Sequence, residues 1–115
     1  MAQKKNQMQK LPQAAQQMAL AGLVEYQKDA IVSRQLIQRK TGSATLFAFD
    51  KGQALSEHTA PFDAMVYVVA GGAEITIAGH AYKLQAGETI IMPANQPHAV
   101  KAAQQFKMLL IMIRS

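Results

Sequence analysis

The chain has no cysteine, no tryptophan and no long apolar segment, and each absence argues against one class of protein. Without cysteine there is no disulfide framework and no thiolate chemistry, a composition that suits a cytoplasmic protein. No apolar run approaches the roughly 20 residues that a bilayer-spanning helix needs. The first ten residues carry lysines, but the apolar core of a signal peptide does not follow them. We therefore predict a cytoplasmic protein with no membrane partner.

Clustered positive charge is also missing, although the formal net charge is +5 over 115 residues. Three of the twelve basic residues lie in the first ten positions, and the others are scattered along the chain. Aromatic residues, which stack on bases in many nucleic-acid-binding proteins, make up only 6% of the sequence. The sequence therefore predicts a mildly basic surface and no nucleic-acid partner.

The length fits one domain, and 50% of the residues are hydrophobic, which is enough to form a core. We predict three consecutive parts within it. Residues 1–10 are rich in Gln and Lys and are expected to form a disordered polar leader. Residues 11–29 should hold an N-terminal helix and a connector, and residues 30–115 should form a β-barrel.

A short N-terminal α-helix is predicted over residues 13–21. Its apolar residues recur at approximately helical spacing, Pro12 lies near its start, and Gly22 can end it. The residues that give this spacing are Leu11, Ala14, Ala15, Met18 and Leu23. Because an isolated helix this short is only marginally stable, it should pack against the barrel or a second subunit.

The stretch from Gly52 to Ala102 contains all three histidines and three of the four prolines. Short apolar runs in it are separated by turn signals such as Gly71-Gly72 and Gly79, and Pro93 ends one of the runs. Short β-prone runs at this spacing are typical of an antiparallel sandwich or barrel. The predicted strands cover residues 30–37, 43–49, 55–60, 64–70, 73–78, 81–84, 88–92, 97–102 and 105–114.

Six residues of the central stretch occur at spacings that are typical of a known family. They are Gly52, His58, Gly71, Gly87, Pro93 and His98. Their arrangement resembles the two motifs of the cupin superfamily, G-x5-H-x-H-x3,4-E-x6-G and G-x5-P-x-G-x2-H-x3-N. The resemblance is to small single-domain bacterial cupins and covers about residues 30–113. It implies an all-β double-stranded β-helix, a jelly-roll barrel, to which the N-terminal helix is added.

The resemblance also implies a metal site inside the barrel, but the ligand set is incomplete. In the family, two histidines and a carboxylate of the first motif join one histidine of the second motif on a metal ion. Here the second histidine position falls on Ala60, and the carboxylate position falls on Ala64 or Met65. Only His58 and His98 remain, fewer than the three protein ligands of typical catalytic zinc sites. A divalent metal ion bound by His58 and His98 is therefore an alternative hypothesis.

Other polar residues near the motifs have simpler explanations. Asp63 and Glu57 are sequence neighbours of ligand positions, but adjacent side chains on a strand face opposite sides of the sheet. Either carboxylate would reach the site only if a bulge redirected it. His80 follows a turn glycine and is expected to be solvated, and Asn95 occupies the glycine position of the second motif.

A ligand pocket inside the barrel is the preferred hypothesis for the two remaining histidines. Alanine at two ligand positions would enlarge the cavity and make it more apolar, which favours a small ligand with one polar end near the histidines. The predicted pocket residues are His58, His98, Ala60, Ala64, Val66, Met92, Gln53 and Tyr67. The alternative is a purely structural role, in which the histidines form hydrogen bonds with each other or with Gln53, Tyr67 or Asn95.

Three functions remain open at this point. The first is a small-molecule-binding domain anchored by His58 and His98. The second is a metal-dependent enzyme similar to cupin isomerases, decarboxylases or dioxygenases, and the third is a structural or interaction domain with a silent pocket. We also expect a homodimer, because the family implies one and because the apolar C-terminal strand and the sheet edges need cover.

Overall fold

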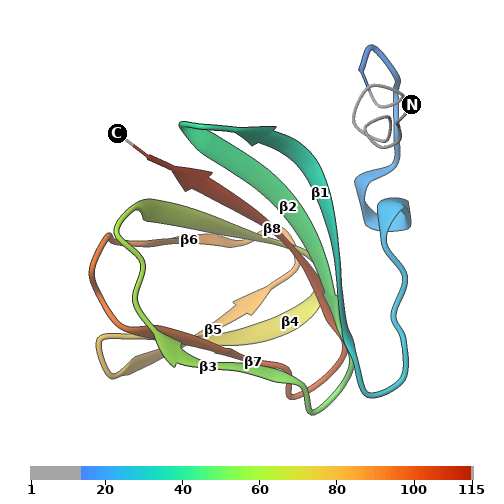
Figure 1. The fold of residues 1–115 in the computed structure, drawn as a ribbon. Helices are drawn as coiled ribbons and strands as arrows, with labels where there is room; N and C mark the ends of the chain where they lie inside the picture. The colour runs from blue at the N-terminus through green and yellow to red at the C-terminus, as the bar shows by residue number, and fades with distance from the viewer. Residues whose placement is uncertain (1–13, 115) are drawn as a thin grey trace.

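The computed structural model describes residues 14–114, and the leader predicted over residues 1–10 lies outside this range. The described residues form eight antiparallel strands and one 3-10 turn (Figure 1). The strands are β1 (Ile31–Arg39), β2 (Gly42–Phe49), β3 (Ala54–His58), β4 (Asp63–Ile77), β5 (His80–Gln85), β6 (Thr89–Met92), β7 (His98–Lys101) and β8 (Phe106–Ile113). The all-β jelly-roll prediction is confirmed, with two corrections given below, one to the strands around Gly71-Gly72 and one to the N-terminal helix.

The strands form two sheets that share β4. The long sheet has the order β6-β4-β8-β2-β1, and the short sheet has the order β5-β4-β7-β3. The first part of β4 pairs with β6 and β8, and the second part pairs with β5 and β7. Figure 1 shows the two sheets meeting at one end of the molecule and separated at the other. Two connections, residues 59–62 and 93–97, cross between the sheets at the separated end.

Gly71 lets β4 pass from one sheet to the other without interruption. Its φ is +74°, a left-handed conformation that favours glycine, and a β-bulge lies just before it, between Val68 and Ala70. A Cβ atom at Gly71 would come within 2.9 Å of the Cα of Phe106. The prediction that Gly71-Gly72 is a turn between two strands is therefore wrong: the glycines bend one 15-residue strand.

The core fills the space between the inner faces of the sheets. The rings of Phe49 and Phe106 are fully buried and stacked, with centroids 4.5 Å apart and planes at 14°. Along β4, Val66 and Val68 point inward while Met65 and Tyr67 point outward, the alternation that a half-buried strand requires. The aromatic pair lies next to Gly71, so tight packing and close backbone approach occur at the same end of the barrel.

The N-terminal helix predicted over residues 13–21 is wrong for the part of the chain that the structure describes. Residues 16–19 have no regular structure, Ala15 has a φ of +58°, and only a 3-10 turn, η2 (Leu20–Leu23), follows. A helix of nine residues gains little without a matching surface. Here the apolar residues pack directly on the outer face of the long sheet, where Val24 meets Leu46 and Ala48.

Two cations hold this N-terminal segment on the sheet. The Nζ of Lys107 donates a hydrogen bond to the carbonyl of Ala21 at 2.6 Å and lies 5.0 Å from the ring centroid of Tyr26. The guanidinium of Arg34 donates to the carbonyl of Leu23 at 3.2 Å. The segment is therefore docked on one part of the outer face of the long sheet.

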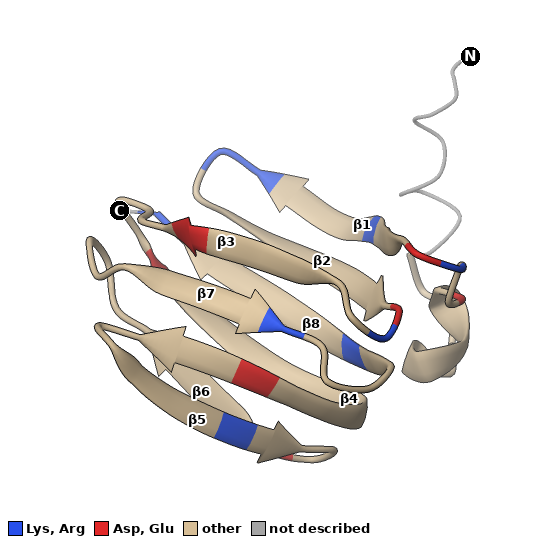
Figure 2. Cartoon of the chain, turned by 90° about the horizontal axis from the view of Figure 1, so that it is seen from below, with Lys and Arg blue, Asp and Glu red and all other residues tan. Residues whose placement is uncertain are grey.

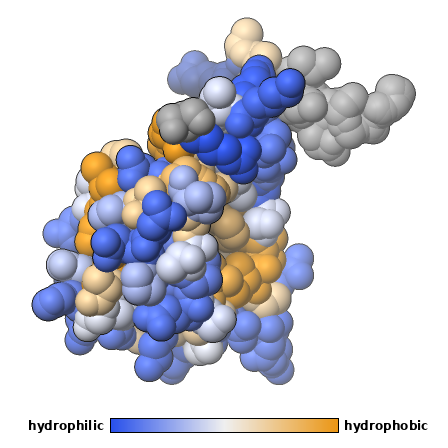
Figure 3. All heavy atoms as spheres, turned by 60° about the vertical axis from the view of Figure 1, so that its left-hand side comes forward, coloured by the Kyte–Doolittle hydropathy of each residue, from blue (hydrophilic) through white to orange (hydrophobic). Residues whose placement is uncertain are grey.

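Charged residues are spread over the surface rather than gathered. Figure 2 shows the short sheet with isolated basic and acidic positions on separate strands. On β4, Glu74 has Lys83 as its partner on one side and Lys101 on the other. Figure 3 shows apolar side chains reaching a mainly hydrophilic surface in patches. Within residues 14–114 there is no helix with the length and apolar character needed to cross a membrane.

Candidate functional site

Two histidines from neighbouring strands of the short sheet form the candidate site. His58 ends β3 and His98 begins β7, and the two are direct partners in the antiparallel pairing. Their ring centroids lie 4.4 Å apart, and the rings meet edge to face at 73°. Because cross-strand partners share a sheet face, both side chains lie on the same face of the short sheet. The His98 side chain is only 6% exposed there.

Each histidine is oriented by the backbone carbonyl of the residue two positions before it. The Nδ1 of His58 lies 2.7 Å from the carbonyl oxygen of Ser56, and the Nδ1 of His98 lies 3.1 Å from that of Gln96. A carbonyl can only accept, so both Nδ1 atoms carry the proton. In the neutral form each Nε2 is then a hydrogen-bond acceptor and the ring nitrogen available to a ligand. Within residues 14–114, no protein hydrogen bond engages either Nε2.

The surroundings of His98 favour its neutral form. Burial lowers the pKa of His98 below its usual value, the nearby His58 lowers it further, and the bond to the Gln96 carbonyl opposes both effects. His98 also faces Ile77 across the strand pair, and Val100 continues the same buried face of β7. His98 is thus placed in an apolar environment, whereas His58 is exposed at the mouth of the barrel.

The two connections beside the histidines are bonded to each other. The backbone N–H of Asn95 donates to the carbonyl of Ala60 at 2.7 Å, and the N–H of Ala94 donates to Oδ1 of Asp63 at 2.8 Å. Asn95 has a φ of +66°, which asparagine tolerates better than most residues. This conformation explains how asparagine can stand at the glycine position of the second motif.

The donor set does not fit the metal centre that the family resemblance implies. Ala60 and Ala64 offer no ligand atoms, and one carboxylate oxygen of Asp63 is bonded to the 93–97 connection. Across residues 14–114, no group of three or more His, Cys, Asp or Glu side chains could hold a metal ion. His58 and His98 supply two nitrogens, one fewer than the smallest protein set of typical catalytic zinc sites.

The structure places the remaining predicted pocket residues in different environments. Ala64, Val66 and Met92 are buried on the inner face of the long sheet, opposite the sheet that carries the histidines. Tyr67 is not with them, because it points outward from β4, and Gln53 lies at the far end of β3 from His58. The sequence did not single out Ile77 or the Ser56 and Gln96 carbonyls. Each carbonyl belongs to the residue two positions before a histidine, and this common spacing in the sequence could have indicated both contacts.

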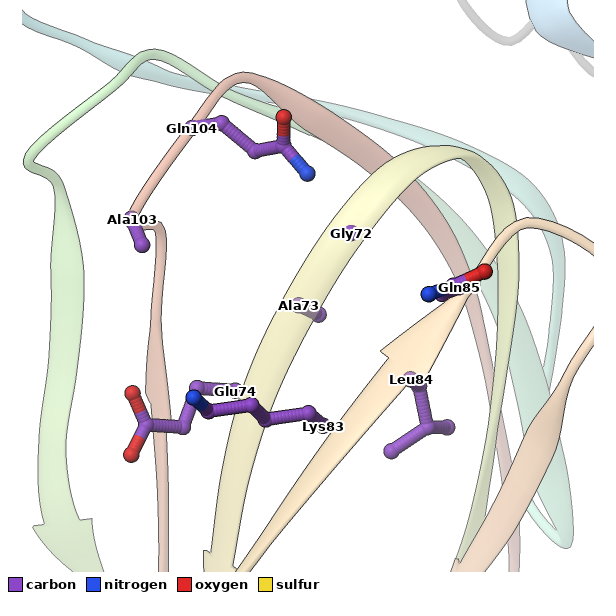
Figure 4. A pocket seen from close by; sticks show the side chains of 8 residues that line it. All are labelled: Gly72, Ala73, Glu74, Lys83, Leu84, Gln85, Ala103 and Gln104. Atoms are coloured by element: carbon purple, nitrogen blue, oxygen red, sulfur yellow. The ribbon is translucent and has the colours of Figure 1, made fainter.

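The hollows lined by described residues lie away from the histidine pair. One of about 430 Å³ lies over β4, β5 and the loop before β8, as Figure 4 shows. Glu74 and Lys83 extend across it, and the amide of Gln104 is directed toward Gly72. A Cβ atom at Gly72 would lie 2.7 Å from the Nε2 of Gln104, so this side chain already occupies part of the hollow.

Comparison with known proteins gives the family. The family model described as cupin domain matches residues 45–114. A protein of unknown function from Streptococcus pyogenes has 42% sequence identity and a TM-score of 0.84, and the match covers 88% of this chain and 89% of that chain. A cupin superfamily protein from Desulfitobacterium hafniense has 28% identity and a TM-score of 0.83, with 88% and 93% covered.

A third similar structure comes from a larger protein. The cupin 2 conserved barrel domain protein from Leptotrichia buccalis is 40% identical with a TM-score of 0.79, and the match covers 82% of this chain but 46% of that one. No match was found among curated proteins. The matched family model spans more than half of the chain, and it includes the second motif and His98. The chain therefore belongs to the cupin family.

Proposed function

We propose that this cupin domain binds a small molecule at the mouth of its barrel, with His58 and His98 as polar anchors. The observation that carries the proposal is that both rings bond a nearby backbone carbonyl through Nδ1. Neither histidine therefore needs the other as a hydrogen-bond partner. Two adjacent rings with available Nε2 atoms form a preorganised polar patch at the edge of an apolar interior.

The hydrogen-bonding character of the pair indicates the kind of ligand. With the protons on Nδ1, the neutral rings offer two acceptors and no donor toward the barrel. A matching ligand presents hydrogen-bond donors, such as hydroxyl or amine groups, at one end. The rest of it should be apolar, because the inner face of the opposite sheet carries Ala64 and Met92.

Metal-dependent catalysis of the isomerase, decarboxylase or dioxygenase type has less support. The alanines at the family's ligand positions and the engagement of Asp63 leave too few donors for that chemistry. A silent pocket in an interaction domain is the other alternative, and it predicts that nothing binds near the histidines. A fragment screen combined with native mass spectrometry separates these three hypotheses.

A fragment screen by ligand-observed NMR on untagged protein tests the proposal. Fragments with hydroxyl or amine donors should bind, and His58→Ala or His98→Leu should weaken them by about tenfold, the loss expected for a hydrogen bond of about 1.4 kcal/mol. The matched control is His80→Ala, which removes an exposed histidine at the start of β5 and should leave binding unchanged.

Native mass spectrometry and elemental analysis of the same untagged preparation complete the test. A co-purified organic molecule that His98→Leu no longer retains would support the proposal and identify the ligand. A stoichiometric metal ion would contradict it in favour of the enzyme hypothesis. Equal fragment binding by wild type and both site variants would contradict it in favour of a silent pocket.

A further inference from the structure

The connection between β6 and β7 holds the backbone carbonyl that orients His98. Residues 93–96 form a tight turn in which the N–H of Gln96 donates to the carbonyl of Pro93 at 3.4 Å. Asn95 has a φ of +66° at the third position of this turn, as a type II turn requires. The carbonyl of Gln96, at the end of the turn, accepts from Nδ1 of His98 at 3.1 Å. The conformation of the turn therefore decides how the His98 ring is oriented.

Each backbone N–H of residues 94–96 has a hydrogen-bond partner, as a fixed backbone conformation requires. The N–H of Gln96 bonds within the turn, and the N–H of Asn95 donates to the carbonyl of Ala60 at 2.7 Å. The N–H of Ala94 donates to Oδ1 of Asp63 at 2.8 Å. The first two acceptors are backbone carbonyls, whereas the third belongs to a side chain. A substitution at position 63 can thus remove one support of the turn and leave the other two in place.

The pairing of β4 with β6 explains why a side chain is needed at this place. Ala64 pairs with Met92, so the same register places Pro93 opposite Asp63. Proline has no N–H and cannot extend the ladder of hydrogen bonds. The carboxylate of Asp63 instead accepts the N–H of Ala94, the first one beyond the proline, across 31 positions of the sequence. This bond joins the start of β4 to the turn.

Asp63 joins the two connections at the separated end of the barrel (Figure 1). It directly follows the 59–62 connection, and its carboxylate holds the 93–97 connection together with the carbonyl of Ala60. Side chains alternate along β4, so that Ala64 is buried on the inner face and Asp63 is exposed on the other face. The carboxylate therefore contacts the turn from outside the interior of the barrel.

We propose that Asp63 is a positioning residue of the ligand site, an inference that rests on the proposed binding of a small molecule by His58 and His98. The carboxylate of Asp63 fixes the turn, the turn fixes the Gln96 carbonyl, and that carbonyl holds the proton of His98 on Nδ1. The Nε2 of His98 is thereby kept as a hydrogen-bond acceptor toward the barrel. Asp63 supports the site without contacting the ligand, as residues behind a binding site often do.

Long-range ¹H–¹⁵N NMR of Asp63→Ala at about pH 8.5, where free imidazoles are neutral, tests the proposal. The wild type should show the proton of His98 on Nδ1, and the variant should show a mixture of Nδ1 and Nε2 tautomers. Hydrogen exchange of the Ala94 amide should become at least about tenfold faster, since its acceptor is lost. His58 should keep its proton on Nδ1, because the carbonyl of Ser56 lies in β3 and not in the turn.

Two further variants separate positioning from a general loss of order. Asp63→Asn keeps a side-chain oxygen that can accept the N–H of Ala94, and it should preserve the wild-type tautomer of His98. Glu88→Ala is the matched control, because Oε1 of Glu88 accepts the N–H of Gln85 at 2.8 Å in the turn between β5 and β6. It removes the same kind of bond in a different connection and should leave the tautomer of His98 unchanged. A thermal melt of each variant checks that it is folded.

Fragment binding measures the consequence for the ligand site. Asp63→Ala should weaken fragments with hydroxyl or amine donors by about threefold to tenfold, at most as much as His98→Leu does. Asp63→Asn should bind these fragments like the wild type. If the wild type and His98→Leu bind the fragments equally, the proposed ligand site fails and not the link between Asp63 and His98, which the NMR spectra test separately.

Three results would overturn the positioning role of Asp63. The first is a His98 proton that stays on Nδ1 in Asp63→Ala. The second is the same mixture of His98 tautomers in Glu88→Ala, which would show that any loosened connection has this effect. The third is unchanged fragment binding by Asp63→Ala under conditions in which His98→Leu weakens it.

Discussion

The two ends of the barrel are built in opposite ways. At the end where the sheets meet, the stacked rings of Phe49 and Phe106 pack next to the bend at Gly71, whose backbone lies close to that of Phe106. At the separated end, His58 and His98 lie against each other, and two connections are joined by a backbone hydrogen bond. The first end therefore contributes stability, and the second end offers chemistry.

The difference shows why residues of the two family motifs have different roles. Gly71 closes the first cupin motif at the packed end, and its conformation and contacts explain it without any ligand. His98 of the second motif is buried with an available Nε2, which packing alone does not require. Substitutions at the packed end should change unfolding free energy, and substitutions at the histidine end should change binding with little effect on stability.

The largest loss of stability is expected for Phe106→Ala at the packed end. The ring is fully buried and stacked on Phe49, so its removal should lower the unfolding free energy by about 3–5 kcal/mol. Urea denaturation followed by circular dichroism measures this loss. A loss below about 1 kcal/mol would contradict the view that this end carries the packing.

Gly71→Ala is expected to cost about 2–4 kcal/mol in the same assay. The added Cβ meets the backbone of Phe106 and also forces a left-handed φ on alanine. Gly79→Ala is the matched control: Gly79 has a φ of +84° and no heavy atom within 4 Å of the added Cβ. The control should lower the unfolding free energy by only about 1 kcal/mol. Equal losses for both variants would show that the close contact between residue 71 and the backbone of Phe106 is unimportant.

A smaller effect is expected in the 93–97 connection at the histidine end. Asn95→Ala should lower the unfolding free energy by about 1 kcal/mol, because alanine is less favourable at a φ of +66°. Asn95→Gly should be close to neutral, since glycine adopts this conformation readily. If both variants lose the same stability, the Asn95 side chain contributes more than its backbone conformation.

The smallest effect is the pH dependence that His98 contributes. Its pKa is lowered in the folded protein, so the unfolded chain binds more protons in the interval between the lowered pKa and the ordinary value of 6.5. The contribution of His98 to stability is complete above 6.5 and is lost as the pH falls through that interval. Urea midpoints measured from about pH 8 to about pH 5 should fall less steeply for His98→Leu than for the wild type.

Much of the fold could be predicted from the sequence because its signals are local. Alternating apolar residues and turn glycines gave the strands, and the spaced motifs indicated the jelly-roll barrel. The continuous β4 was missed because glycines in a bend and glycines in a turn look alike in one dimension. The N-terminal helix was predicted from spacing, but tertiary packing against Leu46 and Ala48 favoured an extended path with one 3-10 turn.

The candidate site could be predicted only in part. The pairing of His58 with His98 followed from the motif positions. The outward direction of Tyr67 depends on the register of β4, which the sequence left undetermined. The bond from Ala94 to Asp63 is a contact between residues 31 positions apart, and no local pattern reports it.

The most direct test of the account is the tautomeric state of the two histidines. Long-range ¹H–¹⁵N NMR of untagged protein at about pH 8.5, where free imidazoles are neutral, distinguishes a protonated nitrogen from an unprotonated one. We predict protons on Nδ1 and free Nε2 atoms for both His58 and His98, and a mixture of tautomers for the exposed His80. A proton on Nε2 of either site histidine would contradict the proposed acceptor pair and the ligand class derived from it.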